Sequence, residues 1–198
     1  MKHKEFEYLV EALCSLPSIS KKGAKKIAFS LLRKDDKYFD EFIKRLIDFK
    51  KNIKFCSICN NIADNSLLCS ICNNENRDKN KLCIVSSIES LEKIEESNSF
   101  FGIYYVLDES QIQNKTNHTF LSKIEYLINY FNTKEILIAT DMTRKGHEIS
   151  NLINKFLYEK KFDISIYRIA IGIPSNAALD YMDWESLKHA IENKRKIN

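Results

Sequence analysis

Two identical four-residue motifs, Cys56-Ser-Ile-Cys59 and Cys69-Ser-Ile-Cys72, constrain the fold of this chain more than any other feature. Each motif places two thiols at the apex of a tight turn, and two facing turns close a tetrahedral site of four thiolates. The nine residues between the motifs are too few and too polar to pack by themselves, which indicates that a metal ion holds the segment together. The spacing predicts one structural Zn²⁺ per chain, with no open position for a reacting water.

Other uses of these cysteines stay open, namely four free or redox-active thiols, or ligands of an iron–sulfur cluster. The remaining two cysteines, Cys14 and Cys83, stand in apolar patterns and are predicted to be buried core thiols. No apolar run approaches the roughly 20 residues that span a bilayer, and the N-terminus lacks the shape of a secretory signal. We therefore expect a cytoplasmic protein without membrane contact, in which cysteines bind metal or stay reduced.

The first quarter of the chain is predicted to be helical and basic. Residues 1–54 hold 14 Lys and Arg against 8 Asp and Glu, whereas residues 55–198 hold 17 against 19. A basic end on a near-neutral body favours an anionic polymer as partner, although a solvated helix face is the alternative. Apolar residues at helical spacing predict helices over 4–14, from Ser20 onward and over about 38–51. Their apolar faces comprise Phe6, Leu9, Val10 and Leu13, then Ala24, Ile27, Ala28 and Leu31, then Phe39, Phe42, Ile43, Leu46 and Ile47.

The turn between the first two helices has the character of a phosphate-binding site. Pro17 ends the first helix and the Ser20 hydroxyl is predicted to cap the second. A helix N-terminus attracts anions, and lysines on its first turns add positive charge where a duplex backbone would lie. The predicted DNA contacts are the lysines opposite the apolar face, Lys21, Lys22, Lys25 and Lys26, and a plain helical hairpin is the alternative.

From residue 82 onward, strands alternate with helices. Apolar runs predict strands over 82–85, 102–107, 136–139 and 164–170, and helical patterns lie at about 88–97, 120–131, 149–157 and 184–193. This order predicts an α/β fold with a mostly parallel sheet flanked by helices. Tyr104 and Tyr105 lie in a strand pattern, which favours core packing over base stacking, and residues 108–119 are predicted to form a polar loop. Candidate functional residues follow the strands, at Ser86, Ser87, Asp108, Glu109, 140–148 and 172–176.

Taken in order, these pieces resemble known families. Leu16-Pro17-Ser18-Ile19-Ser20 resembles the hairpin of helix-hairpin-helix DNA repair proteins, in which glycines stand where this chain has Ser18 and Ser20. The whole order resembles the bacterial recombination mediator family RecR, and the likeness continues through Arg77-Asp78, Leu82 to Val85, Ile138 to Thr140 with Thr143 and Gly146, Arg168 to Pro174, Leu179 to Asp183, and Leu187. The resemblance implies a helix-hairpin-helix region at 1–53, a four-cysteine zinc finger at 54–79, a Toprim domain at 80–173, and a C-terminal loop and helix at 174–198.

This sequence departs from the pattern of catalytic Toprim domains. Those domains place a Glu after the first strand and an Asp-x-Asp pair after a later one, and these carboxylates hold Mg²⁺. Here the first position holds Ser86 and the later stretch reads Asp141-Met142-Thr143, so we predict no enzymatic activity, although Asp108 and Glu109 could supply carboxylates. Three further features are Lys145, where the family generally has Glu, Asn176-Ala177, where it has glycines, and His147, which is predicted to be a surface or capping residue.

The resemblance implies a non-enzymatic, DNA-binding recombination mediator. Such proteins act with RecO, and often RecF, to load the recombinase RecA on single-stranded gaps, and they form dimers or ring-like tetramers around gapped or duplex DNA. Two other classes remain open, a Toprim-type Mg²⁺-dependent nuclease or strand-transfer enzyme, and a protein-only adaptor that docks on an acidic partner.

Overall fold

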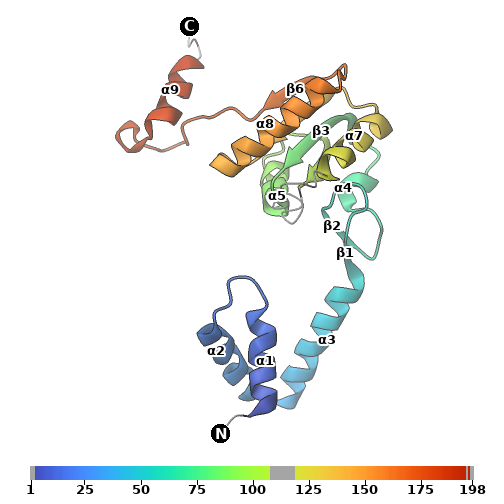
Figure 1. The fold of residues 1–198 in the computed structure, drawn as a ribbon, viewed down its shortest axis with the longest axis vertical. Coiled ribbons are helices and arrows are strands. Elements are labelled where there is room, and N and C mark those ends of the chain that lie inside the picture. The colour runs from blue at the N-terminus through green and yellow to red at the C-terminus, as the bar shows by residue number, and fades with distance from the viewer. Residues whose placement is uncertain (1–2, 108–118, 195, 197–198) are drawn as a thin grey trace. The chain divides into compact units, whose positions relative to one another are not determined.

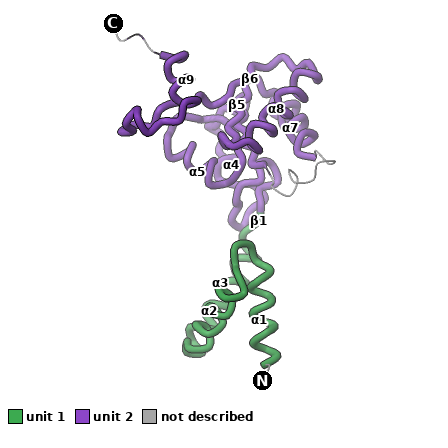
Figure 2. Tube along the Cα trace, turned by 60° about the vertical axis from the view of Figure 1, so that its left-hand side comes forward, with its two compact units in different colours: residues 1–54 green, residues 55–198 purple. Residues whose placement is uncertain are grey.

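The computed structural model describes residues 3–107, 119–194 and 196. It divides into two compact units, residues 1–54 and residues 55–198, and each is described by itself (Figure 2). The zinc-finger residues belong to the second unit together with the sheet. No helix in the described part of the chain is long and apolar enough to cross a membrane.

The first unit holds α1 (Lys4–Cys14), α2 (Lys21–Leu32) and α3 (Asp36–Asn52). Val10 of α1 packs against Ala24 and Ala28 of α2, with Phe6, Leu13, Cys14 and Ile19 around them. The Ser20 side chain accepts a hydrogen bond from the Gly23 N–H at 3.2 Å, which confirms the predicted cap.

Much of the predicted apolar face of this unit is exposed. Leu9 and Ile27 are both 38% exposed, and α3 has no buried residue at all. The third helix is confirmed, but its apolar face, which includes Phe39, Ile43, Leu46 and Ile47, stays exposed within a single chain. Helical periodicity shows which side of a helix is apolar, but it does not show what covers that side.

Between residues 53 and 73 lie a short hairpin and a short helix that the sequence did not predict. The hairpin of β1 (Ile53–Phe55) and β2 (Ile62–Asp64) carries the first cysteine motif, and α4 (Ser70–Asn73) carries the second. These elements have only three or four residues each, too few for a periodic pattern to stand out.

The main sheet is fully parallel, with strand order β4-β3-β5-β6. Of these strands, Figure 1 labels β3 and β6. Its strands are β3 (Asp78–Val85), β4 (Gly102–Val106), β5 (Glu135–Ala139) and β6 (Ser165–Arg168). In register, Cys83 lies between Tyr104 of β4 and Leu137 of β5. The predicted parallel α/β sheet is confirmed.

Helices α5 (Ile88–Glu96), α7 (Thr119–Phe131) and α8 (Arg144–Glu159) cover this sheet. On one face, α7 and α8 pack against Leu82, Ile84 and Tyr105, and on the other face α5 packs against Cys83, Val85 and Tyr104. Both tyrosines are fully buried, which confirms core packing and excludes base stacking at these two residues. Cys83 is buried as predicted, but Cys14 is only half-buried, because it lies at the end of α1 beside the exposed hairpin.

Several element boundaries differ from the prediction. Helix α8 begins at Arg144, five residues before the predicted start at 149, because the Thr143 side chain caps it by accepting from the Gly146 N–H at 3.2 Å. Strand β3 begins at Asp78, so the expected domain boundary between residues 79 and 80 falls inside a strand. Of the predicted loop at 108–119, residues 108–118, including Asp108 and Glu109, lie outside the described residues, and Thr119 begins α7.

The chain ends with a 3₁₀ turn (Leu179–Tyr181) and α9 (Trp184–Glu192). No residue of α9 is buried, and Trp184 and Ile191 are 75% and 57% exposed. The helical pattern at 184–193 predicts that Leu187 and Ile191 face inward. This is wrong for Ile191 within one chain, and Leu187 is only half-buried.

Candidate zinc centre and nucleic-acid interface

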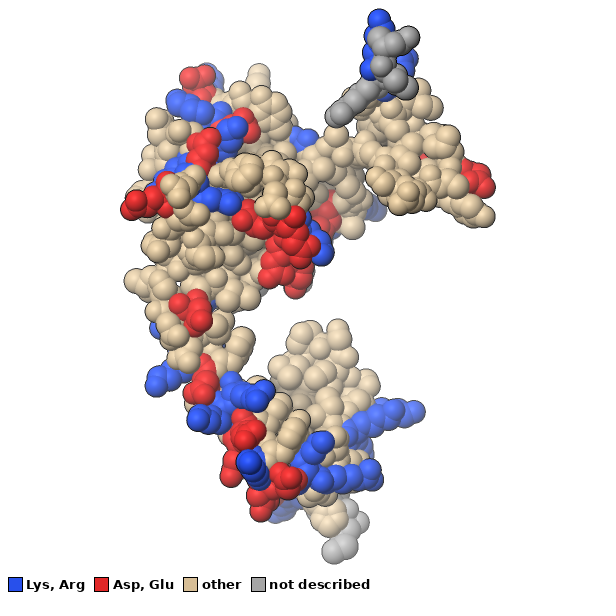
Figure 3. All heavy atoms as spheres, turned by 180° about the vertical axis from the view of Figure 1, so that it is seen from behind, with Lys and Arg blue, Asp and Glu red and all other residues tan. Residues whose placement is uncertain are grey.

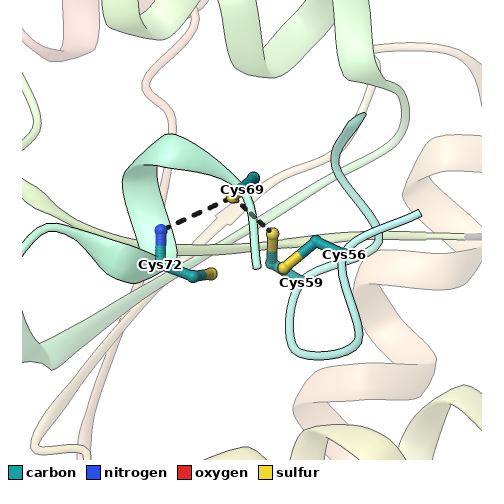
Figure 4. Close-up of side chains that lie close together, drawn as sticks. All are labelled: Cys56, Cys59, Cys69 and Cys72. Atoms are coloured by element: carbon teal, nitrogen blue, oxygen red, sulfur yellow. Dashed lines mark hydrogen bonds between the residues drawn. The ribbon is translucent and has the colours of Figure 1, made fainter. Parts of the chain in front are cut away.

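The four predicted zinc ligands converge on one buried point. The Sγ atoms of Cys56, Cys59, Cys69 and Cys72 all lie within 4.8 Å of one another, and Figure 4 shows the two pairs arriving from two separate turns. All four residues are buried. Four thiolates at this separation match the first coordination sphere of a structural zinc ion, which binds sulfur at about 2.3 Å.

Backbone hydrogen bonds shape each turn around its cysteines. In the first turn the Asn61 N–H donates to Cys59 Sγ at 3.4 Å, and in the second the Cys72 N–H donates to Cys69 Sγ at 3.4 Å. Asn60 takes a left-handed conformation, with φ of 62°, and this conformation lets the chain turn directly after Cys59. Cys69 is also the N-cap of α4, so its side chain faces the start of a helix.

The contacts among these cysteines shift their pKa values in opposite directions, because the hydrogen bonds that lower the pKa of Cys69 raise those of Cys59 and Cys72. Cys59 Sγ lies 3.5 Å from Cys69 Sγ. Hydrogen bonds from Cys59, then from Cys72, hold the pKa of the Cys69 thiol far below its ordinary value. A bound zinc ion deprotonates its thiol ligands outright, so the raised pKa values of Cys59 and Cys72 do not prevent the site from forming. The geometry fits zinc and leaves no ligand position for a water, so the centre is structural.

The hairpin before α2 has serines at the two positions where the motif it resembles has glycines. Ser18 takes a left-handed conformation, with φ of 63°, which glycine adopts at much lower cost. Ser20 has an extended conformation and serves as the N-cap of α2. Ser18 thus forms the left-handed turn, and the Ser20 hydroxyl supplies a helix cap that glycine lacks.

The four predicted DNA contacts lie together on the first turns of α2. Lys21, Lys22 and Lys26 are exposed and Lys25 is half-buried. In the described part of the chain, none of the four forms an ion pair, and Figure 3 shows basic side chains projecting from this unit into solvent. These positive charges are therefore available to an anionic partner.

A second basic surface, which the sequence analysis did not single out, continues along α2. A surface hollow of about 560 Å³ is lined by Lys26, Phe29, Ser30, Arg33 and Lys34. The signal was present, because six basic residues and no acidic residue lie between Pro17 and Lys34. The hollow joins Arg33 and Lys34 to the predicted lysines as candidate phosphate contacts.

The residues that follow β3 and β5 meet at the carboxyl edge of the sheet. Ser86, after β3, accepts a hydrogen bond at its Oγ from the Asp141 N–H at 3.0 Å. Gly146 lies so close to this turn that a Cβ placed on it would stand 2.0 Å from the Asp141 carbonyl oxygen. Among the described residues, the four cysteines are the one cluster of three or more potential metal ligands.

His147 and Arg168 meet beside this edge. Arg168 Nη2 lies 2.8 Å from His147 Nδ1, and because a guanidinium is only a donor, His147 accepts this hydrogen bond. His147 therefore binds a neighbouring side chain at the surface, as expected of a residue outside any ligand set. Asn176, where the resemblance has glycine, keeps a left-handed conformation with φ of 69°.

Comparison with known protein families covers the first two regions directly. A family described as the helix-hairpin-helix of RecR matches residues 6–49, and one described as the four-cysteine zinc finger domain of RecR matches residues 53–74. The first match contains the lysine-bearing helix α2, and the second contains all four cysteines. The second match also identifies the metal of the four-thiolate centre as zinc.

Curated relatives extend the likeness over nearly the whole chain. The chain is 46% identical to "Recombination protein RecR" of Ureaplasma urealyticum serovar 10 over 196 residues, which cover 98% of this chain and 96% of the relative. It is 33% identical to the protein of the same name from Clostridium perfringens, over 96% of each chain. With the relative from Finegoldia magna it shares 30% identity over 98% of this chain and 97% of the relative. The chain therefore belongs to the RecR family.

Proposed function

We propose that this protein is a DNA-binding recombination mediator that catalyses no reaction of its own. The observation that carries the proposal is the unpaired lysine cluster on the first turns of α2, directly after a hairpin that keeps its left-handed turn at Ser18. The relatives are recombination proteins by name, which gives the DNA-binding surface its biological setting. Lys21, Lys22, Lys25 and Lys26 are the proposed phosphate contacts, with Arg33 and Lys34 as their extension.

Binding through these residues is expected to be tolerant of sequence and sensitive to salt. Lysines at a helix start contact phosphates, and phosphates carry no sequence information. Each phosphate contact releases counterions, so affinity falls steeply as salt rises. A surface of this kind suits gapped and duplex DNA alike.

The absence of catalysis is inferred from the groups at the carboxyl edge of the sheet. Ser86 holds the backbone of Asp141 in place of the carboxylate of a Toprim enzyme, and Thr143 caps α8 in place of the second Asp. At the positions where a Toprim enzyme has its carboxylates, the described residues offer Asp141 alone, which is fewer than a Mg²⁺ site for phosphoryl chemistry requires. The sheet then serves as a scaffold and a surface for partner proteins, for which we propose RecO and RecF.

A homodimer or homotetramer accounts for the apolar surface that a single chain leaves exposed. An apolar groove of about 760 Å³ in the first unit includes Phe6, Phe29, Leu32 and Phe39, and Trp184 is exposed on α9. Exposed apolar patches of this kind mark interaction sites. Assembly would also multiply the lysine clusters around one DNA, so that weak contacts add up. Because the proposed partner is the chromosome, we place the protein in the cytoplasm.

We keep the division into regions at 1–53, 54–79, 80–173 and 174–198 as functional regions. The first binds DNA, the second binds zinc, the third is the Toprim-like scaffold, and the fourth contributes to assembly. The second and third share one structural unit, so their division describes roles and not separate folding.

The test is a binding titration on gapped duplex DNA at two salt concentrations, with and without Mg²⁺. Lys21→Ala combined with Lys25→Ala is expected to weaken binding. It should also make the slope of log K against log salt less negative by about 2. Lys50→Ala with Lys51→Ala, which removes the same charge from the end of α3, is the matched control and should change binding less.

Other outcomes separate the alternatives. Unchanged binding in the α2 variant would move the DNA surface elsewhere. Mg²⁺-dependent cleavage that disappears in Asp141→Ala would establish a nuclease. Failure to bind DNA even at low salt, together with binding to a RecO-type partner, would establish a protein-only adaptor.

A further inference from the structure

The zinc module, residues 53–74, forms hydrogen bonds with the outer edge of the main sheet. Strand β4 lies at one end of the sheet, so one of its edges has no strand beside it. At the carboxyl end of that edge the Val106 N–H donates to the Cys59 carbonyl at 2.8 Å, and the Asn60 side-chain Nδ2 donates to the Val106 carbonyl at 3.1 Å. The next residue points the other way, since the Leu107 N–H donates to Val85 of β3 at 2.9 Å. The first cysteine turn therefore takes the place of a neighbouring strand.

The two cysteine motifs also pack on opposite faces of the sheet. Ile58, the third residue of the first motif, packs against the cluster on the α7 and α8 face, which includes Leu82, Ile84 and Tyr105. Ile71, the third residue of the second motif, packs against the cluster on the α5 face, which includes Val85 and Tyr104. The identical motifs thus enclose the edge of the sheet, with one isoleucine on each side.

The metal centre is the main link between the two motifs; beside it, the Ser57 N–H donates to the Leu67 carbonyl at 3.0 Å. The buried residues of the zinc module are the four cysteines and Ala63, with Ile58, Leu68 and Ile71 packed around them. Without metal, this cluster is too small to fix two turns in place, because metal binding and folding are one event in modules of this size. The isoleucines and the Cys59 carbonyl would then lose their positions relative to the sheet.

We infer that zinc binding closes the edge of β4 and, with it, builds part of the surface at the carboxyl end of the sheet. A hollow of about 510 Å³ at this end is lined by Phe55 and Asn60 from the zinc module, Ser86 from the end of β3, and Val106 from β4. One side of its wall therefore depends on the metal. An unpaired strand edge is a template for pairing with other chains, so the zinc module also protects the sheet against edge-to-edge association.

The experiment is hydrogen–deuterium exchange on the full chain, zinc-loaded and after zinc removal by a chelator, with zinc content measured on each sample. Removal is expected to speed exchange of the Val106 amide at least about tenfold, while the amides of 136–139 in β5 keep their protection. Equal exchange of Val106 in both states would overturn the inference. An equal loss of protection in β5 would overturn it too, because the metal would then act on the whole sheet.

A variant that keeps zinc tests the same contact directly. Asn60→Gly tolerates the left-handed backbone but removes the side-chain donor to Val106, so exchange at Val106 is expected to rise about fivefold with one zinc still bound. Asn65→Gly is the matched control, since Asn65 is a left-handed asparagine of the same module whose side chain donates to Asp64. If the two variants exchange equally at Val106, the contact does not hold the strand and the inference is wrong.

Discussion

Arg77 binds Glu95 through both terminal nitrogens of its guanidinium, at 2.6 and 3.1 Å. The same guanidinium donates from Nε to the Gly102 carbonyl at 2.8 Å, and the Tyr104 hydroxyl donates to the Glu95 carboxylate at 2.7 Å. The network therefore joins Arg77, directly before β3, to the end of α5 and to the start and middle of β4. The sequence resemblance had included Arg77 without a role, and the structure gives it one.

Replacing Arg77 by Lys is expected to lower the free energy of unfolding by about 2 kcal/mol. Lysine cannot make two parallel bonds to a carboxylate, and the Gly102 carbonyl also loses its donor. The figure lies below the roughly 3–5 kcal/mol of a fully buried pair, because the Glu95 side chain is 29% exposed. Denaturant unfolding measures the change. Lys93→Met, at the exposed Lys93–Glu96 pair, is the control and should leave stability unaltered, so an equal effect of both variants would remove the special role of Arg77.

Ser18→Gly is expected to stabilise the helical unit by about 1 kcal/mol, because glycine adopts the left-handed turn without the cost that serine bears. Ser20→Ala is expected to act in the opposite direction by about 1 kcal/mol, because the α2 cap is lost. Thermal unfolding of the two variants beside the parent chain measures both effects. If Ser18→Gly lowers stability instead, the contacts of the serine side chain stabilise the unit by more than its left-handed backbone costs.

Stability is expected to fall above pH 9 because of Cys83. Burial, and after it the charge of Glu95, raises the pKa of the Cys83 thiol from 9.0 to about 12. The unfolded chain then releases this proton first, so the contribution of Cys83 is complete below pH 9 and is lost as the pH rises toward 12. Above pH 9 the slope approaches about 1.4 kcal/mol per pH unit at most. Cys83→Ala should flatten the dependence of the free energy of unfolding on pH. Denaturation at a series of pH values between 9 and 12 measures this dependence for the parent chain and the variant. Identical slopes in the two proteins would show that folding does not change the pKa of the thiol.

Each chain is expected to carry one zinc ion, which Cys72→Ser should release. A site of four thiolates loses most of its affinity with one ligand, and the folded zinc module is lost with the metal. Metal analysis by mass spectrometry measures the content. Cys14→Ser, at a cysteine far in sequence from the motifs, is the control and should keep its zinc. A folded parent chain without zinc would contradict the assignment of the centre.

Leu32→Glu is expected to shift any assembly toward smaller species. Leu32 lines the apolar groove of the helical unit and is 76% exposed. A carboxylate there would have to be buried in the interface, which costs more than the contact gains. Light scattering over a range of concentrations measures the mass. Tyr158→Glu places the same charge at a residue that is 83% exposed on α8 and should leave the mass unchanged.

Local patterns predicted the elements that depend on their own residues. The cysteine spacing located the zinc centre, and the short apolar runs located all four strands of the sheet, because both signals lie within a few residues. The start of α8 was missed because Arg144 to Glu148 are mostly polar and only the Thr143 cap marks it. The hydrophobic pattern also could not predict that position 146 requires glycine, because this requirement comes from the close approach of the Asp141 carbonyl.

Contacts between distant segments could not be predicted from the sequence. The bond between Val106 and Cys59 joins residues that no periodic pattern relates, and the direction in which Ile58 and Ile71 point follows from the sheet and not from the motifs. In the same way, the periodicity identified the apolar face of α3, but it could not show that this face stays exposed in a single chain.

The placement of Ile58 and Ile71 on the two faces of one sheet sets a limit on how this protein can be divided. A fragment that begins at residue 80 would cut β3 after its second residue and uncover β4 and both isoleucine-binding surfaces together. Such a piece would meet other copies of itself through the strand edge and precipitate at concentrations where the intact chain stays dissolved. Any fragment or chimera made from this protein must therefore contain the cysteine motifs and the sheet together.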